Sequence, residues 1–385
     1  MARERLRLTA IILAVLCLGL AAGALAISRP RATMPREMFP SFAPELPPPG
    51  SCTSGSMCND SEKTPQVEEV FEAPPLIIQP TASAGTTTIL FVGDMMFDRT
   101  VATRSRKDLA YPFAMVKSDP RFLNVDYRVG NLEGPLTSKR RPPEKEIDFV
   151  FDPALGGVLK SMGFHALSQA NNHQLDQGRE GAEDSKEVLT ASGLVSFGDQ
   201  VRDDVESAKA QVEIEGIRVA FLGFNITDNP LDKVAAEDAL ARAEASADIV
   251  IVFPHWGEEY ESKPRQSVRE LAYWFIDHGA DAVIGAHPHW MQSIDLYRGK
   301  LIAYSLGNFV FDQDWSRETN EGLAVVLELG KDSRSLILHP IRQERSQPRF
   351  LSGNDLTDRL KYLAEISDPA LTKSILEGRI PLPVE

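Results

Sequence analysis

The stretch that decides the fold is TTILFVGD, residues 87–94, where a run of β-branched and apolar residues stops at a glycine and an aspartate. This composition favours a short, buried β-strand that ends in a polar loop. Comparable runs recur along the chain at residues 127–129, 166–169, 217–224, 249–253, 282–284 and 301–304. The sequence therefore predicts repeated short strands, several of them followed by a polar segment.

Stretches typical of helices separate several of these runs. They mix good helix formers with apolar residues three and four positions apart, and they span residues 153–162, 178–191, 231–245 and 265–278. Glycine-containing turns within residues 212–224 and 294–304 predict two β-hairpins, and a late strand at 336–340 and a helix at 355–366 are also expected. Alternating strands and helices with hairpins predict an α/β fold with one mixed sheet, or two sheets, flanked by helices.

The composition excludes several classes of protein. The chain has 385 residues, and 41 Lys+Arg against 55 Asp+Glu give a formal net charge of −14. This acidic excess argues against a nucleic-acid-binding protein, which usually has a basic face. Three cysteines are too few for a disulfide scaffold, a cysteine-rich zinc module or an iron–sulfur cluster.

The N-terminus has the pattern of an export signal. Three arginines precede an uncharged apolar run at residues 8–27, and twenty residues in a helix span about 30 Å, enough to cross a bilayer. The arginines favour a cytoplasmic N-terminus, so the rest of the chain is expected outside. Residues 1–27 are either a retained signal anchor or a signal peptide cleaved after the small residues at 24–26.

Residues 28–85 are expected to form an extracytoplasmic linker. This segment holds eleven of the 26 prolines and few large apolar residues, so it cannot bury enough surface to offset its chain entropy. Cys52 and Cys58 lie within it. Outside the cytoplasm they could form a disulfide, or they could remain free or pair between molecules.

Polar motifs follow the predicted strands. In chain order they are GD at 93–94, NxEGP at 131–135, NNHxxDxG at 171–178, HWG at 255–257, GAHPH at 285–289 and SLGNF at 305–309. Because ligands bind at the carboxyl edges of strands in α/β sheets, these motifs predict one shared site.

The residue types in these motifs indicate a metal. Four of the seven histidines fall inside them, together with Asp, Glu and Asn oxygens. This mixture suits Mn, Zn or Fe better than the all-oxygen sites of Ca or Mg. His287 and His289, two residues apart in a strand-end loop, can project on the same side of an extended chain.

The motifs and their order resemble those of the poly-γ-glutamate capsule synthesis (CapA-type) proteins, a family that in turn is similar to calcineurin-like metallophosphoesterases. The resemblance covers about residues 87–329. It implies a four-layer α/β/β/α sandwich with a centre of one or two divalent metal ions at one edge. On this basis residues 86–345 are expected to form the CapA-type domain, and residues 346–385 a C-terminal helical extension.

The resemblance also implies roles for individual residues. The implied metal ligands are Asp94, Glu133, Asn172, His255, His287 and His289. His173 matches a catalytic acid. Met96 departs from the phosphoesterase pattern, which has a histidine at that position, so the resemblance implies one imidazole fewer here.

Two further residues are candidates for catalysis. Asp176, three residues after His173, could hold the imidazole in one tautomer, or it could simply cap a nearby helix. Arg99 could clamp a carboxylate or phosphate, or it could be an ordinary surface arginine.

Three functions fit these observations. The first is an extracytoplasmic metal-dependent hydrolase or transferase acting on an anionic cell-envelope polymer such as poly-γ-glutamate. The second is a non-catalytic assembly or export factor that holds the polymer within a membrane synthase complex, and the third is a secreted phosphodiesterase or nucleotidase. Because the net charge repels a polyanion, binding would depend on local groups such as Arg99, Lys139, Arg140 and Arg141.

Overall fold

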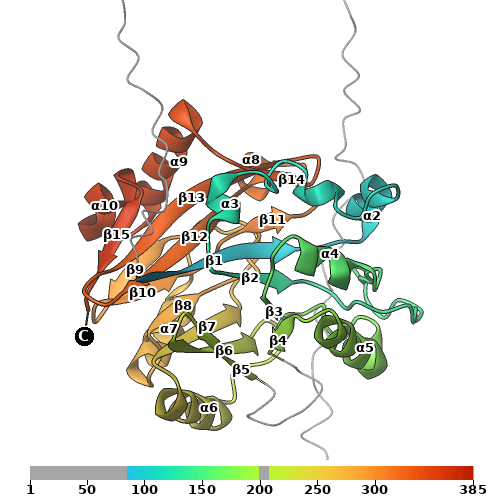
Figure 1. Ribbon diagram of the computed structural model, residues 1–385, viewed down its shortest axis with the longest axis horizontal. Coiled ribbons are helices and arrows are strands. Elements are labelled where there is room, and N and C mark those ends of the chain that lie inside the picture. Colours follow the sequence, from blue (N-terminus) through green and yellow to red (C-terminus); the bar gives the residue numbers. More distant parts are fainter. Residues whose placement is uncertain (1–84, 199–207, 385) are drawn as a thin grey trace, which may run out of the picture. The chain divides into compact units, whose positions relative to one another are not determined.

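Strand β1 (Thr86–Met95) contains the TTILFVGD stretch and lies inside a nine-stranded mixed sheet (Figure 1). The computed structural model describes residues 85–198 and 208–384, which belong to one compact unit, Phe71–Glu385, and all element counts refer to the described residues. The main path of the sheet runs β14 (Gln347–Phe350), β13 (Arg334–Glu344), β12 (Glu321–Gly330), β1, β2 (Tyr127–Leu132), β3 (Ala166–Ser168) and β4 (Val195–Phe197). Beside this path, β11 (Asn308–Val310) pairs with β1, and β15 (Arg379–Leu382) pairs with β13.

A second sheet has six strands. Its order is β5 (Lys209–Ile214), β6 (Ile217–Asn225), β7 (Ile249–His255), β8 (Ala282–Ile284), β10 (Lys300–Ala303) and β9 (Ile294–Tyr297). Strands β5 and β6 pair antiparallel, as do β9 and β10, so the two predicted hairpins are confirmed.

The two sheets pack on each other through a shared apolar core. The Phe91 ring of β1 lies 6.2 Å from Phe221 of β6 and 6.3 Å from Phe253 of β7. Burying rings of this size supplies much of the stabilisation of such a core. This packing brings the ends of strands from both sheets to one region.

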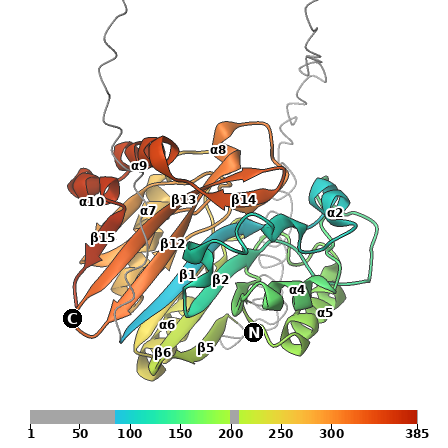
Figure 2. The same ribbon diagram turned by 45° about the horizontal axis from the view of Figure 1, so that its top comes forward.

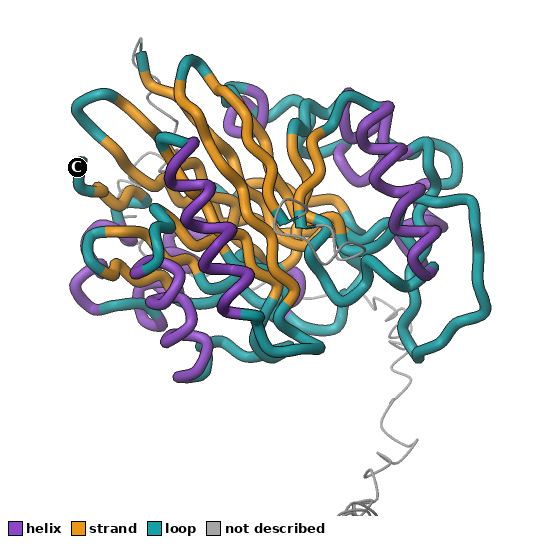
Figure 3. The backbone as a smooth tube through the Cα atoms, turned by 90° about the horizontal axis from the view of Figure 1, so that it is seen from below, coloured by secondary structure: helices purple, strands orange, loops and turns teal. Residues whose placement is uncertain are grey.

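Helices cover the outer faces of the sheets, as Figures 2 and 3 show. On the nine-stranded sheet, α4 (Leu155–Ser161) and α5 (Gly178–Ala191) share an apolar cluster with the outward face of β1. On the six-stranded sheet, α6 (Lys233–Ser246) and α7 (Gln266–Asp277) pack on β7 and its neighbours. The α/β fold predicted from the sequence is confirmed.

Shorter helices and the C-terminal segment complete the domain. They are α2 (Arg99–Ser105), η1 (Tyr111–Phe113), α3 (Pro120–Leu123), α8 (Arg317–Asn320), α9 (Gly353–Ile366), η2 (Pro369–Leu371) and α10 (Thr372–Leu376). Leucines of α9 enter the core between the sheets.

The sheet continues past residue 345, the boundary expected for the CapA-type domain. Helices α9 and α10 form within residues 346–385, but β14 and β15 from this segment both pair with β13. Pro348 and Pro381 lie in these two strands. Proline weakens the sequence signal for a strand, yet it is tolerated at a sheet edge, where its missing N–H is not needed.

Residues 1–84 lie outside the described part of the chain. The signal segment at 1–27, the linker at 28–85 except its last residue, and the pairing of Cys52 with Cys58 therefore remain predictions. Within residues 85–198 and 208–384, no helix combines the length and apolar character needed to cross a bilayer.

Candidate metal centre

The polar motifs converge because glycines allow the loops to touch. A Cβ on Gly93 would lie 1.8 Å from the carbonyl oxygen of Gly307, and the next residue, Asp94, donates its N–H to that same oxygen. A Cβ on Gly285 would lie 2.1 Å from the carbonyl oxygen of Tyr304. Only glycine fits such contacts, so the motif glycines bring the ends of β1, β8 and β10 together.

A buried cluster of two carboxylates and an imidazole lies at this junction. Asp94, Glu133 and His289 each offer one ligand atom, and these atoms all lie within 4.8 Å of one another. The Nδ1 atom of His289 is 3.3 Å from Asp94 Oδ2, and its Nε2 atom is 3.8 Å from Glu133 Oε1. The three residues come from three distant parts of the chain, near the ends of β1, β2 and β8.

The electrostatics of this cluster favour a bound cation. Burial, followed by the charge of Asp94, raises the pKa of Glu133 well above its usual value. The Oε1 atom of Glu133 is buried without a hydrogen-bond partner. Two buried carboxylates and an orphaned oxygen are costly alone, and a divalent ion would neutralise them. The residues present therefore fit a metal ion.

Two asparagines hold the carboxylates in place. Asn131 Nδ2 donates to Asp94 Oδ1 at 2.8 Å and to Glu133 Oε2 at 3.2 Å. Asn171 Nδ2 in turn donates to Asn131 Oδ1 at 3.0 Å. Neither asparagine is among the site residues predicted from the sequence, and the only available signal is their place in the NxEGP and NNHxxDxG motifs.

The remaining predicted ligands lie beside this cluster. His255 Nε2 is 2.9 Å from Asn172 Oδ1, the rings of His255 and His287 are 4.7 Å apart, and the His287 N–H donates to Asp94. Burial lowers the pKa of His287 to about 3 and that of His255 well below its usual value. Both imidazoles are therefore neutral near pH 7, the form that binds metals. The structure thus brings all six predicted ligands together, three of them within reach of a single ion.

The backbone at this site is strained. His287, His289 and Tyr260 have φ values of 99°, 59° and 65°, and Arg99 has 52°. Residues with side chains rarely adopt this left-handed region, which costs of order 1–3 kcal/mol each. Such strain clusters at functional sites, where it fixes side-chain directions.

A histidine–aspartate pair borders the cluster. His173 Nδ1 lies 2.7 Å from Asp176 Oδ2, and the same oxygen accepts the N–H of Phe149 at 2.6 Å. Lys145 Nζ lies 2.6 Å from the other oxygen, Asp176 Oδ1. Because the carboxylate accepts, Nδ1 carries the proton and Nε2 has a free lone pair. Burial lowers the pKa of His173, and the hydrogen bond to Asp176 partly opposes this effect.

Arg99 lies at the mouth of the site. Its guanidinium forms an ion pair with Asp312 and sits 5.2 Å from the ring centre of Phe149 and 5.7 Å from that of Phe311. Phe149 packs against the imidazole of the histidine–aspartate pair, and Phe311 packs against that of the metal cluster. With its side chain 38% exposed, Arg99 can reach an incoming anion.

Met96 does not take part in the cluster. It is fully buried in the apolar layer on the outer side of β1, and its sulfur accepts the N–H of Asp98. The position that holds a histidine in the phosphoesterase pattern therefore supplies no ligand.

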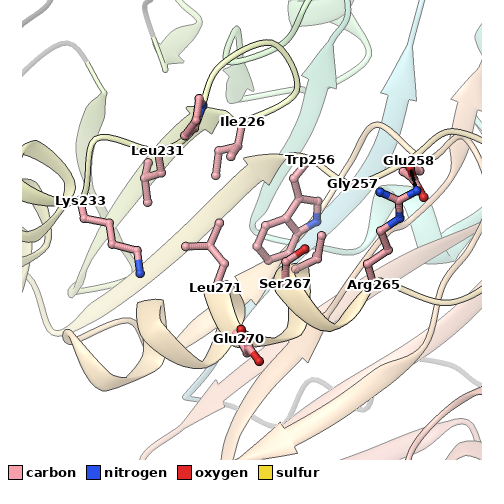
Figure 4. Close-up of a pocket in the computed structure, with 12 residues that line it drawn as sticks. Ile226, Leu231, Lys233, Trp256, Gly257, Glu258, Arg265, Ser267, Glu270 and Leu271 are labelled. Atoms are coloured by element: carbon pink, nitrogen blue, oxygen red, sulfur yellow. Dashed lines mark ion pairs between the residues drawn. The ribbon is translucent and has the colours of Figure 1, made fainter.

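A separate cavity of about 470 Å³ lies beside α7 (Figure 4). Trp256, Leu231 and Leu271 supply its apolar lining, and Arg265, paired with Glu258, lies at one end. Within the described chain, none of the predicted site residues lines it. The metal cluster and this cavity are distinct features.

The fold and the cluster define a class of protein: an α/β domain with a buried carboxylate–imidazole centre where the carboxyl ends of its strands meet. Residues 88–313 match the family model described as "Bacterial capsule synthesis protein PGA_cap". The chain belongs to this family, and the resemblance inferred from its motifs is confirmed.

Individual relatives agree with this placement. The chain is 34% identical over 314 residues to the PGA biosynthesis protein CapA of Bacillus subtilis (strain 168), covering 77% of this chain and 82% of the relative. It is 34% identical over 289 residues to the capsule biosynthesis protein CapA of Bacillus anthracis, covering 68% and 69%. A solved hypothetical protein from Thermus thermophilus aligns with 69% of this chain and 100% of its own, at 16% identity and a TM-score of 0.38, too low to carry an argument.

Proposed function

We propose that this chain is a metal-dependent hydrolase or transferase that acts on an anionic cell-envelope polymer during capsule synthesis. The observation that carries the proposal is the buried Asp94–Glu133–His289 cluster beside the His173–Asp176 pair. The printed functions of the two CapA relatives, PGA and capsule biosynthesis, support poly-γ-glutamate or a similar polymer as the substrate.

Asp94, Glu133 and His289 would hold the first ion, and Asn172, His255 and His287 are placed to complete its surroundings or hold a second. Carboxylates with imidazoles favour Mn, Zn or Fe. When bound, such an ion lowers the pKa of a water molecule to about 7 and polarises a phosphoryl or carbonyl oxygen.

The residues around the cluster would handle protons and charge. Asp176 fixes the proton on Nδ1 of His173, so Nε2 is the atom that takes a proton and returns it to a leaving group. The Asp176 carboxylate stabilises the imidazolium formed in between. Arg99 would orient an anionic group of the polymer at the mouth of the site.

A basic loop beside the site would help to bind a polyanion. Arg140 and Arg141 are exposed, and Lys145 of the same loop reaches the Asn172 carbonyl oxygen at 2.7 Å. This local positive charge lies in a chain whose net charge is −14. Binding of the polymer should therefore weaken as salt is added.

The N-terminal pattern supports a location outside the cytoplasmic membrane. We propose that residues 1–27 anchor the protein and that the α/β domain works beside a membrane synthase. A reporter fused after residue 385 should be active only in its extracytoplasmic form. Activity of a cytoplasm-dependent reporter at the same position would contradict this location.

A second function, polymer binding without catalysis, is favoured by Met96, which leaves the site one imidazole short of the phosphoesterase pattern. To separate the two, the full-length protein is incubated with poly-γ-glutamate or a generic phosphodiester and Mn²⁺ or Zn²⁺. We expect turnover that falls at least 100-fold in His173→Ala.

The matched control is His278→Ala, whose ring bonds to the Trp274 carbonyl of its own helix and lies outside the site. This variant should keep full turnover. Tight binding of poly-γ-glutamate with no turnover of either substrate would instead favour the assembly function.

A further inference from the structure

The two ring nitrogens of His289 face different carboxylates, so its tautomer decides which of them can bind an ion. Nδ1 is 3.3 Å from Asp94 Oδ2, and Nε2 is 3.8 Å from Glu133 Oε1. A neutral imidazole carries its proton on one nitrogen only, and the other nitrogen is the ligand atom. The groups that surround the ring determine which is which.

A buried amide fixes the proton on Nδ1. Asn308 Nδ2 donates to the Thr319 carbonyl oxygen at 3.0 Å and to Gln313 Oε1 at 3.0 Å. Because a backbone carbonyl can only accept, the amide nitrogen of Asn308 must face Thr319. Asn308 Oδ1 then faces His289 Nδ1 at 2.9 Å and can only accept its proton.

The hydrogen-bond chain continues to the rim of the site. Gln313 Nε2 donates to the Tyr260 hydroxyl at 3.1 Å, and the Tyr260 ring stacks on His289 at 5.9 Å. The Tyr260 N–H donates to the Pro288 carbonyl oxygen at 2.9 Å. His289 is therefore held at one edge by Asn308 and on one face by Tyr260, with Gln313 linking these two supports.

We propose that Asn308 and Gln313 are positioning residues that hold His289 in the Nδ1–H tautomer and so direct Nε2 at the unpartnered Glu133 Oε1. The inference rests on the metal site of the proposed function and assigns the ligand atom within it. Two independent observations converge on it: the acceptor-only carbonyl of Thr319, and the orphaned oxygen on the opposite side of the ring.

The first test measures metal affinity. Asn308→Leu in the full-length protein keeps the side-chain size but removes the acceptor for His289. Titration calorimetry with Mn²⁺ should show affinity reduced 10–100-fold, the range found when the partner of a metal-bound histidine is lost. Gln313→Ala should reduce affinity less, because the Thr319 carbonyl still orients Asn308.

Gln343 provides a matched control. Its Nε2 atom donates to the same Thr319 carbonyl at 3.0 Å and its Oε1 accepts the Phe311 N–H, so it is another buried amide. No hydrogen bond joins it to His289 in the described chain. Gln343→Leu should leave Mn²⁺ affinity unchanged; an equal loss in both leucine variants, or no loss in a folded Asn308→Leu protein, would overturn the proposal.

The second test needs no metal and no substituted amide. Nitrogen-15 NMR of the metal-free protein, with the His289 signals assigned by their absence in His289→Gln, should show a protonated Nδ1 and an unprotonated Nε2. A proton on Nε2 would overturn the inference. If the wild-type protein showed this tautomer but bound no Mn²⁺, the metal site would fail while the tautomer assignment stood.

Discussion

Individual side chains at the centre are held in an arrangement that disfavours their own charges. Asp94 and Glu133 are both completely buried, and Asn131 is the donor that they share. The charged forms of both carboxylates therefore repel each other in a region without water. Removing one of these charges should stabilise the metal-free protein, and adding a cation should do the same for the wild type.

Glu133→Gln keeps the shape of the side chain and its hydrogen bond to Asn131 but removes the charge. Since the pKa of Glu133 is raised in the folded state, its ionisation destabilises the metal-free protein above the ordinary pKa of about 4.3. At pH 7 the metal-free variant should therefore melt a few degrees higher than the wild type, where about 1 kcal/mol corresponds to roughly 2–4 °C. Scanning calorimetry measures this difference.

The same scans with Mn²⁺ should raise the wild-type melting temperature and leave that of Glu133→Gln nearly unchanged. The control is Glu328→Gln, in which a buried carboxylate is already paired with Arg379. That variant should melt lower than the wild type, because its loss leaves an arginine without its partner. A Glu133→Gln protein that melts lower in the same way would contradict the account.

The members of this site could be predicted, but their contacts could not. The types and order of Asp94, Glu133 and His289 carry the chemistry, and each motif contains its ligand. The supporting role of Asn131 depends on how the ends of β1 and β2 are aligned. Asn308 acts on His289 only because Thr319 lies behind it, eleven residues further along the chain.

At the scale of elements, close approach of strands and loops makes certain glycines indispensable. Gly93 touches the Gly307 carbonyl at the point where β1 enters the site. A methyl group there must separate β1 from the loop that precedes β11. Gly157, inside α4, has open space around its Cβ position.

Gly93→Ala should therefore lower the free energy of unfolding by about 3 kcal/mol or more. Gly157→Ala should raise it by about 0.5–1 kcal/mol, because alanine is the better helix former. Urea unfolding of both proteins gives these values. Equal stability of Gly93→Ala and the wild type would show that the loops are not in contact as described.

Strands were predictable where β-branched runs ended in polar motifs, as in β1 and β7. Strand β12 was not, although it pairs with β1 along six positions. Its sequence, EGLAVVLELG, is an apolar run rich in leucine and alanine, and such a run is compatible with a buried helix as well as a strand. Only its pairing with β1 and β13 selects the strand.

At the scale of the whole molecule, buried neutral histidines make the domain sensitive to acid. Burial lowers the pKa of His339 to about 3 and that of His165 to about 4. The unfolded chain binds protons at these residues below about pH 6.5, whereas the folded protein does not. Each such histidine therefore lowers the free energy of unfolding as the pH falls from about 6.5 to its folded pKa.

His339→Leu tests this effect away from the metal centre. The ring is 3% exposed, its Nε2 atom has no hydrogen-bond partner, and it packs against Phe350. The variant should match the wild type at pH 7 and exceed it at pH 4.5 by about 2–3 kcal/mol, since one pH unit corresponds to about 1.4 kcal/mol. Urea unfolding at both pH values measures the difference, and parallel losses in both proteins would rule out this role of His339.

The central claim is that the buried cluster holds a transition metal ion. The most direct measurement is elemental analysis of the full-length protein as purified, compared with the double variant His287→Ala, His289→Ala. Wild-type protein should contain Mn, Zn or Fe at one or two ions per chain, and the variant, shown to be folded by circular dichroism, should contain none. Equal metal content in the two proteins would contradict the claim.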